Sequence, residues 1–346
     1  MKKLNRVLSL SAAAALALSL TACSGGTSGT ADTPAADNTS ASTGGSGDTY
    51  TVAVIKQMDH ASLDEIADAI AARLDEIAAE NGVTIQYEVT SGQGDQTVLR
   101  QLADQAIADG VDAIIPIATT AAQVAAVSAE ESQTPVVFAA ISYPETADLT
   151  GIDYVTGTSD ALDTNLILDM MLAQNPELQS VGLLYSLSEP NSEVPIADAK
   201  AYLDEKGIAY TEATANTNDE VIAAASSLIA DGVDAVFTPT DNIIMAAELA
   251  IYEDFINAGI PHYTGADSFV RNGAFATCGV NYTDLGAQTA DLAYQAMTEG
   301  MDSLEDYYQV AGGLITVNSE TAEALGIDTS VFDSMGEVAA VTTTEE

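Results

Sequence analysis

Polar and aromatic side chains gather directly after short apolar runs in this sequence, where buried strands would end. In the first half these side chains are Gln57, Met58, Asp59, His60, Thr119, Thr120, Ser142 and Tyr143. In the second half they are Tyr185, Ser188, Glu189, Asn191, Ser192, Asp241, Asn242, Asp267 and Ser268. Hydroxyls and backbone N–H groups at helix starts are suited to a carboxylate, and Asp241 or Asp267 can hold an ammonium group. Because Tyr143, Tyr185 and Tyr282 can stack on a flat body, these residues together predict a pocket for a zwitterion with a flat side chain.

The same residues also have simpler interpretations. Thr119, Ser142 and Asp241 could only cap helices, and the tyrosines could only fill the core. His60 could begin a helix without any further role. His262 lies inside a strand pattern and is interpreted as structural.

Motifs of the common enzyme classes are absent from the sequence. It has no G-x-S-x-G, no H-E-x-x-H, no P-loop and no cysteine pair with metal-binding spacing. Its two histidines are far apart, which does not suit a metal site. No nucleophile with a base and an orienting partner can be named, so we expect a binding protein without metal or cofactor rather than an enzyme.

The spacing of apolar residues predicts the same order of strands and helices twice. The first half has predicted strands at 50–55, 83–89, 111–117 and 136–141, with helices over 63–79, from Asp95 or Thr97 to Asp109, and from a cap at Thr119 or Thr120 to Ala129. The second half has strands at 180–185, 208–213, 233–238 and 262–265, with helices over 193–205, 219–230 and 243–258. Such alternation predicts an α/β protein of two doubly wound parallel sheets.

One segment of the sequence occurs twice. IADGVDA fills residues 107–113 and again 229–235, and the copies differ only after a few further apolar positions. Open α/β sheets bind ligands beyond the carboxyl ends of their strands. We therefore expect Thr119 and Thr120 to line one wall of a cleft, and Asp241 and Asn242 the opposite wall.

The N-terminal residues are typical of an export signal. Lys2, Lys3 and Arg6 precede an apolar run that is too short to span a membrane. Residues 20–23, Leu-Thr-Ala-Cys, resemble a bacterial lipobox, in which Cys23 becomes the lipidated first residue of the mature chain. We therefore predict a signal peptide over 1–22 and an extracytoplasmic protein anchored to the cell membrane by lipid.

The segment after Cys23 is predicted to be a flexible tether over 23–49. Residues 24–48 contain no aromatic residue and no Ile, Leu, Val or Met, so they cannot bury enough apolar area to fold. The other cysteine, Cys278, is then left without a partner for an intramolecular disulfide.

The charge of the chain is strongly negative. It has 52 acidic and 9 basic residues, which gives a formal net charge of −43 at pH 7. This charge excludes nucleic acid as a natural partner and makes polyanions unsuitable ligands. Most of the carboxylates are interpreted as a solvated surface, so a pair of them cannot be singled out as catalytic.

A set of short motifs resembles the solute-binding proteins of ABC importers, in particular the family whose better-known members bind tryptophan, tyrosine or phenylalanine. The motifs are Gln57 with His60, Ala61, Leu63 and Asp64; Ala118 to Gln123; Val155 to Gly157; Tyr185 with Ser188 to Ser192; Pro239 to Asn242; and Tyr282 with Leu285 and Gly286. The resemblance covers about residues 50–327. In one departure, this chain has Ser142-Tyr143-Pro144 where many members have Ser-Asp-Pro, which leaves the identity of the amino acid open.

The resemblance implies the type I periplasmic-binding-protein fold with three crossovers between two lobes. We expect the crossovers near 151–157, 274–281 and 308–313, and a helix over 283–300 that returns to the first lobe. The first lobe then comprises 50–154 and 281–308, the second comprises 155–280 and 309–330, and 331–346 form an acidic tail.

The resemblance also implies a function. The protein would be a monomeric, lipid-anchored receptor that binds an amino acid, expected to be aromatic, and delivers it to ABC permease subunits. Gln123 enters the predicted site through this resemblance alone. A sugar, nucleoside or purine on the same fold remains an alternative, as do a ligand sensor, an adhesin and an extracellular enzyme.

Overall fold

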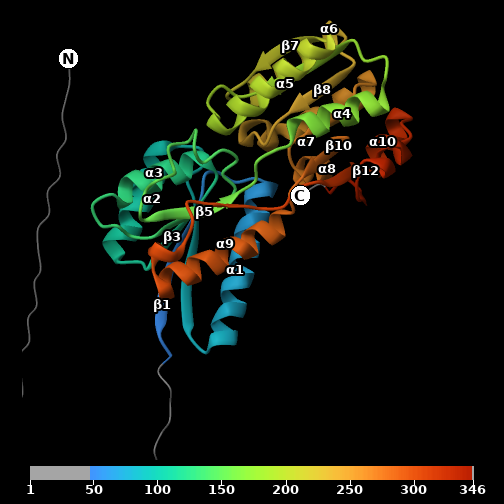
Figure 1. Cartoon of the computed structure of the whole chain (residues 1–346). Coiled ribbons are helices and arrows are strands. Elements are labelled where there is room, and N and C mark those ends of the chain that lie inside the picture. The colour runs from blue at the N-terminus through green and yellow to red at the C-terminus, as the bar shows by residue number, and fades with distance from the viewer. Residues whose placement is uncertain (1–46, 345–346) are drawn as a thin grey trace, which may run out of the picture. The chain divides into compact units, whose positions relative to one another are not determined.

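The computed structural model describes residues 47–344, which form two α/β lobes (Figure 1). The predicted signal peptide, Cys23 and nearly all of the predicted tether lie outside the described residues, as do Glu345 and Glu346. Within residues 47–344, none of the helices combines the length and apolar character needed to cross a bilayer.

The first lobe is built on a parallel sheet whose strand order is β11-β5-β4-β3-β1-β2. Its elements are β1 (Thr49–Lys56), α1 (Ala61–Asn81), β2 (Thr84–Ser91), α2 (Gln96–Asp109), β3 (Ala113–Ile117), α3 (Thr119–Ala129), β4 (Val136–Phe138), β5 (Val155–Ser159), α9 (Tyr282–Glu299), η2 (Met301–Ser303) and β11 (Tyr308–Gln309). The chain leaves β1 toward β2 and returns to add β3 on the other side. This change of direction opens a crevice at the carboxyl ends of β1 and β3.

The second lobe repeats that arrangement with the strand order β13-β12-β10-β9-β8-β6-β7. Its elements are α4 (Thr164–Gln174), β6 (Ser180–Tyr185), η1 (Pro190–Ser192), α5 (Glu193–Lys206), β7 (Ala209–Thr214), α6 (Asn218–Asp231), β8 (Ala235–Thr238), α7 (Asn242–Ala258), β9 (His262–Thr264), α8 (Asp267–Arg271), β10 (Ala276–Gly279), β12 (Leu314–Asn318), α10 (Ser319–Leu325), η3 (Thr329–Ser334) and β13 (Val338–Val341). Only the β10–β12 pair of this sheet is antiparallel within residues 47–344. The prediction of two doubly wound sheets is therefore confirmed.

Helices cover both faces of the first sheet, and the strand residues alternate to match. Val52 and Val54 of β1 point into a core shared with α1 and α9, whereas Ile55 points into a core shared with α2 and α3. The helices α1 and α9 lie side by side on their face (Figure 1). Gly286 allows this close approach, because a Cβ there would lie 2.7 Å from the backbone oxygen of Ile66. The packing brings the start of α9 close to α1, where both helices reach the carboxyl ends of the strands.

The chain passes between the lobes three times, and only the first connection lies later than the sequence suggested. The connecting residues are 160–163, 280–281 and 310–313. Residues 155–157 were expected in a crossover and residues 155–159 in the second lobe, but residues 155–159 form β5, in which Val155 pairs with Val136 of β4 in the first sheet. The short segment Val-Thr-Gly-Thr-Ser consists mainly of small and polar residues, which is why the sequence indicates a linker there.

The C-terminal segment also differs from the expected acidic tail. Residues 338–341 form β13, and Val338 pairs with Ile315 of β12 at the edge of the second sheet. The strand has only four residues and follows Glu337, so it shows no clear hydrophobic period.

The two copies of IADGVDA occupy equivalent places in the two lobes. Gly110 ends α2 and Gly232 ends α6, with φ values of 74° and 70° that favour glycine. The strands β3 and β8 follow, and then the copies diverge. Asp241 caps α7 with its side chain, but the cap of α3 is Ala118, which makes no side-chain bond. The prediction that Thr119 or Thr120 caps α3 is therefore wrong, because the helix already begins at Thr119.

Candidate functional site

The carboxyl ends of strands from both lobes surround one cavity. Among the residues predicted for the site, those that line it are His60, Thr119, Ser142, Asn191, Asp241, Asn242 and Tyr282. The other lining residues were not predicted for the site, and they are Ser62, Leu63, Ile66, Ala118, Ala140, Asp160, Thr240, Met245, Ala266 and Phe269. The cavity volume is about 20 Å³, enough for about one water molecule. An amino-acid-sized ligand can occupy this space only if the lobes move apart.

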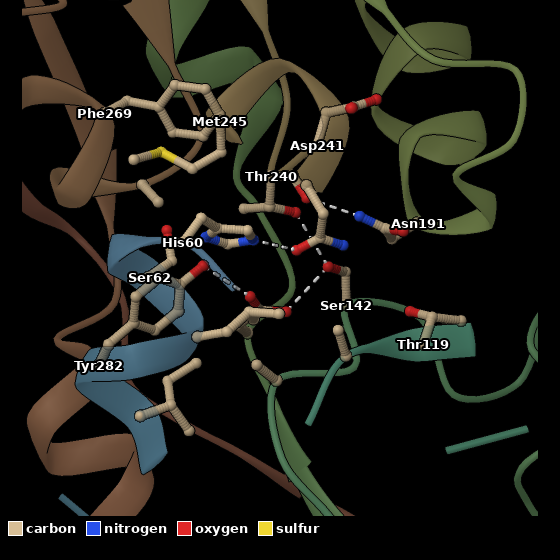
Figure 2. Close-up of a pocket in the computed structure, with 17 residues that line it drawn as sticks. His60, Ser62, Thr119, Ser142, Asn191, Thr240, Asp241, Met245, Phe269 and Tyr282 are labelled. Atoms are coloured by element: carbon tan, nitrogen blue, oxygen red, sulfur yellow. Dashed lines mark hydrogen bonds between the residues drawn. The ribbon is translucent and has the colours of Figure 1, made fainter. Parts of the chain in front are cut away.

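The lining of the cavity is polar on one side and apolar on the other. Figure 2 shows Thr119, Ser142 and Asn191 on one side, with Phe269 and Met245 on the opposite side. Besides His60 Nδ1, two lining atoms are buried without a hydrogen-bond partner within residues 47–344, namely Thr119 Oγ1 and Asn191 Oδ1. Buried polar atoms are nearly always hydrogen-bonded, so these two atoms indicate where a polar ligand group would be recognised.

Hydrogen bonds join the two lobes around the cavity. His60 at the start of α1 bonds to Asn242 at the start of α7, with 3.0 Å between His60 Nε2 and Asn242 Oδ1. The hydroxyls of Ser142 and Thr240 are 3.2 Å apart. Farther out, Arg271 of α8 pairs with Glu65 of α1. The described arrangement is therefore a closed one, in which residues of both lobes hold each other.

Glu189 is the centre of a buried network between the lobes. Its carboxylate accepts a hydrogen bond of 2.8 Å from Gln57 Nε2 of the first lobe and one of 2.6 Å from Asn242 Nδ2 of the second. Gln57 Oε1 in turn accepts from the backbone N–H of Thr120 at 3.0 Å. Burial and the nearby Asp241 carboxylate raise the pKa of Glu189 to about 8. The four predicted residues Gln57, Thr120, Glu189 and Asn242 thus form one unit, of which only Asn242 lines the cavity.

His60 is held neutral by its surroundings. Burial lowers its pKa to about 4. Because Asn242 donates its Nδ2 to Glu189, its Oδ1 must accept, so His60 Nε2 carries the proton. His60 Nδ1 is then a buried acceptor without a partner in the described part of the chain. A ligand donor could occupy that position.

Asp241 is fully buried and already saturated with hydrogen bonds. One oxygen accepts from the N–H groups of Ile243 and Ile244, both at 3.1 Å. The other accepts from the Ser186 N–H and the Ser192 hydroxyl, both at 2.7 Å. Burial raises the pKa of Asp241, and these four bonds counter that effect. The predicted residues Asp241 and Ser192 therefore act together as a brace within the second lobe.

Asp160 is a second buried carboxylate that lines the cavity, and it has fewer side-chain partners than Asp241. It follows β5, is 4% exposed and lines the cavity. Ser142 Oγ donates to its Oδ1 at 2.8 Å, and the Tyr282 hydroxyl donates to its Oδ2 at 3.0 Å. Burial raises its pKa despite these bonds. The rule that polar residues follow strands would have found Asp160 if β5 had been recognised.

Besides Gln57, Thr120, Glu189 and Ser192, five further predicted residues lie away from the cavity lining. Gln123 donates to the Ala147 carbonyl, the Tyr143 hydroxyl to the Leu162 carbonyl, and the Tyr185 hydroxyl to Glu212. Ser188 is exposed, and Asp267 pairs with Arg271. His262, interpreted as structural, bonds to Glu248 and Thr238 in the core of the second lobe. Among residues 47–344, no cluster of His, Cys, Asp and Glu has a metal-binding arrangement.

Known proteins that are similar to this chain include two that bind an amino acid. The chain is 27% identical over 251 residues to a tyrosine-binding protein of Clostridioides difficile, an alignment that covers 71% of this chain and 72% of that protein. It is 27% identical to an ABC domain from Streptococcus pneumoniae solved in complex with L-Trp, with a TM-score of 0.75 over 84% of this chain and 100% of that one.

A second solved structure is the ligand-free, open form of a substrate-binding protein with adhesive properties from Clostridium difficile. It is 25% identical, with a TM-score of 0.64 over 85% of this chain and 100% of that chain. The family model of ABC transporter substrate-binding proteins matches residues 51–336, and this chain therefore belongs to that family.

Proposed function

We propose that this protein is the extracytoplasmic receptor of an ABC importer and that it captures an aromatic amino acid between its lobes. The observation that carries the proposal is the cavity between the lobes, with polar groups on one side and Phe269 and Met245 on the other. An amino acid with a flat side chain has the same division between a polar and an apolar end. The ligands named for two relatives, tyrosine and L-Trp, support this choice.

The ligand carboxylate would lie at the start of α3. Thr119 is the first residue of that helix, and its hydroxyl is one of the buried atoms without a partner among residues 47–344. The positive end of the helix dipole and the first backbone N–H groups favour an anion there. No lysine or arginine lines the cavity within the described residues, so this helix start would take the place of a basic side chain.

The aromatic body would extend toward the apolar side of the cavity. Phe269 comes from α8, Met245 from α7, and Leu63 and Ile66 from α1. Aromatic and thioether side chains pack well against an aromatic ring. Closure of the lobes would then bury both ends of the ligand at once.

Delivery and anchoring complete the proposal. We propose that the closed protein presents both lobes to the permease subunits of an ABC importer, a partner that the match to ABC transporter substrate-binding proteins supports. The lipid anchor rests on Cys23 and the residues before it, and we propose that the receptor works as a monomer at the cell membrane. Metabolic labelling with a palmitate analogue in wild type and Cys23→Ser would test the anchor.

A ligand screen tests the proposed function. Thermal shift and isothermal titration calorimetry with the twenty amino acids should show that an aromatic amino acid binds most tightly. Matched series of monosaccharides and of nucleosides serve as controls for the alternative ligand classes. No response to any amino acid, or tighter binding of a sugar or nucleoside, would reject the proposal.

A further inference from the structure

We infer that Asp160 is the counter-charge for the ammonium group of the ligand. The inference rests on the proposed function and deepens it, because it makes a free α-amino group a requirement of the site. Asp160 lies in the connection between β5 and α4, is 4% exposed and borders the cavity. Its side-chain partners among the described residues are two neutral hydroxyls, from Ser142 and Tyr282.

The electrostatic surroundings of Asp160 call for a cation. A buried carboxylate is costly unless a positive charge compensates it. Neutral hydroxyls satisfy part of its hydrogen bonding but leave its charge in place. In the closed arrangement, burial raises the pKa of Asp160 by more than the hydrogen bonds from Ser142 and Tyr282 lower it, so the net shift is upward. An ammonium group brought by the ligand would supply the missing charge.

No basic side chain of the described chain can take that role. The six lysines and arginines within residues 47–344 are all engaged elsewhere. Lys56 pairs with Asp59 and Asp64; Arg73 pairs with Glu76, Glu80 and Asp291; and Arg100 pairs with Asp104. Lys200 pairs with Glu212, Lys206 lies over the Tyr202 ring, and Arg271 pairs with Glu65 and Asp267. His60, which also lines the cavity, is neutral because burial lowers its pKa to about 4.

Comparison with Asp241 sharpens the assignment. Both carboxylates border the same cavity, but Asp241 accepts four hydrogen bonds from its own lobe. Asp160 accepts only two side-chain hydrogen bonds from the described residues. A carboxylate can accept about four hydrogen bonds. Asp160 therefore retains the capacity to bind an ammonium group, whereas Asp241 does not.

The position of Asp160 agrees with the proposed placement of the carboxylate. Asp160 is bonded to Ser142, and in Figure 2 Ser142 lies between Thr119 and the side of the cavity that carries His60 and Tyr282. The α-amino and α-carboxyl groups of an amino acid are attached to one carbon. Asp160 and Thr119 would therefore hold the two groups while the side chain points toward Phe269.

Binding of three matched ligand types to Asp160→Asn tests the inference. The ligands are L-tyrosine and L-tryptophan, their des-amino acids 3-(4-hydroxyphenyl)propionate and indole-3-propionate, and the amines tyramine and tryptamine. Wild type should bind an amino acid at least about 100-fold more tightly than its des-amino acid, because losing one partner of a buried charge pair costs that much or more. Asp160→Asn should abolish this difference and should weaken the amines, while the des-amino acids keep their affinity.

The exposed residue Asp204 of α5 provides a matched control. Asp204→Asn removes the same charge and should change no affinity. Asp160→Asn should melt at the same temperature as wild type or higher without ligand, because a buried charge has been removed. A lower melting temperature together with weaker binding of the des-amino acids would assign Asp160 a structural role and overturn the inference.

The outcomes separate the two proposals. If wild type binds amino acids and Asp160→Asn binds them equally well, the ammonium site is wrong and the proposed function stands. If wild type binds the des-amino acids as tightly as the amino acids, the requirement for an ammonium group is wrong. If wild type binds neither amino acids nor amines, both proposals fall.

Discussion

Gln57 of the first lobe donates a 2.8 Å hydrogen bond to Glu189 of the second lobe, across 132 residues of sequence. Both side chains are buried, each with 4% exposure. When the lobes open, this bond must break and Glu189 must gain access to water. Closure of the protein and the ionisation of Glu189 are therefore linked.

Ligand affinity should fall as the pH rises from 6.5 to 8. In the closed arrangement, burial and the nearby Asp241 carboxylate raise the pKa of Glu189 from its ordinary value of 4.5 to about 8. Opening exposes Glu189 to water and lowers its pKa, so the closed form binds more protons than the open form at pH values below about 8. Burial lowers the pKa of His60 from 6.5 to about 4, which has the opposite effect below pH 6.5. The two effects oppose each other below pH 6.5. Above that pH the effect of Glu189 remains, and a single linked proton can lower the affinity by at most about tenfold per pH unit.

Calorimetry at several pH values, in buffers of different ionisation enthalpy, measures this effect as proton uptake on binding. Asp241 is the charged neighbour that contributes to the raised pKa. Glu189→Gln should remove the fall in affinity above pH 6.5, whatever its effect on the affinity itself. The matched control is Glu193→Gln, an exposed position on α5. An affinity that is independent of pH between 6.5 and 8 in wild type would contradict the prediction.

Gln57→Ala should weaken ligand binding about 10- to 100-fold. The substitution removes the bonds to Glu189 and to the Thr120 N–H, and leaving a buried donor or acceptor unsatisfied costs about 1–3 kcal/mol. Gln123→Ala is the matched control, because Gln123 donates only to the Ala147 carbonyl and lies outside the cavity lining. Calorimetry with the tightest amino acid gives both values, and equal affinities for the two variants would refute the role of Gln57 in closure.

Asp241→Ala should lower the stability of the protein by about 3 kcal/mol, because it removes a helix cap and leaves buried donors unsatisfied. Asp95→Ala is the natural comparison, since Asp95 also accepts two backbone N–H groups at the start of a helix but is exposed. We expect Asp95→Ala to lower the free energy of unfolding by about 1 kcal/mol. Urea unfolding measures both values. A smaller loss for Asp241 than for Asp95 would show that its bonds do not brace the second lobe.

His60 should favour ligands whose side chain carries a donor. Its Nδ1 is a buried acceptor on a ring that lines the cavity, and a hydrogen bond to it would be worth about 1 kcal/mol. Wild type should therefore bind tyrosine or tryptophan several-fold more tightly than phenylalanine. His60→Leu keeps an apolar side chain of similar bulk and should remove this preference. If His60→Leu still prefers tyrosine or tryptophan over phenylalanine, the preference comes from another residue.

The fold could be predicted where strands are apolar and helices end in a clear signal. IADGVDA shows both features, and it marks equivalent junctions in the two lobes. The strands that were missed are short and rich in small or polar residues, such as β5 (Val-Thr-Gly-Thr-Ser) and β10 (Ala-Thr-Cys-Gly). Such strands are stabilised by pairing with strands that are distant in sequence. The amino-acid pattern of the strand itself gives no indication of that pairing.

The site could be predicted only in part for the same reason. Residues that follow apolar strands, such as Thr119 and Asn242, were found because the strands were visible. Met245 and Phe269 belong to the apolar faces of α7 and α8, and a periodic pattern does not distinguish a residue that faces a cavity from one that faces the core. Tyr185 was placed by its strand end, but its hydroxyl turns to Glu212.

The hydrogen bond between Tyr282 and Asp160 has a consequence for the order of events in ligand release. Asp160 begins the first connection between the lobes, and Tyr282 directly follows the second. A ligand held by Asp160 would therefore sit at the pivot, where displacement is least when the lobes swing open. Contacts with Asn191 and Asn242 in the second lobe would break first, while the ligand stays attached to the pivot. The residence time of the ligand would then depend on the rate at which the lobes close again relative to the rate at which the ligand dissociates from Asp160.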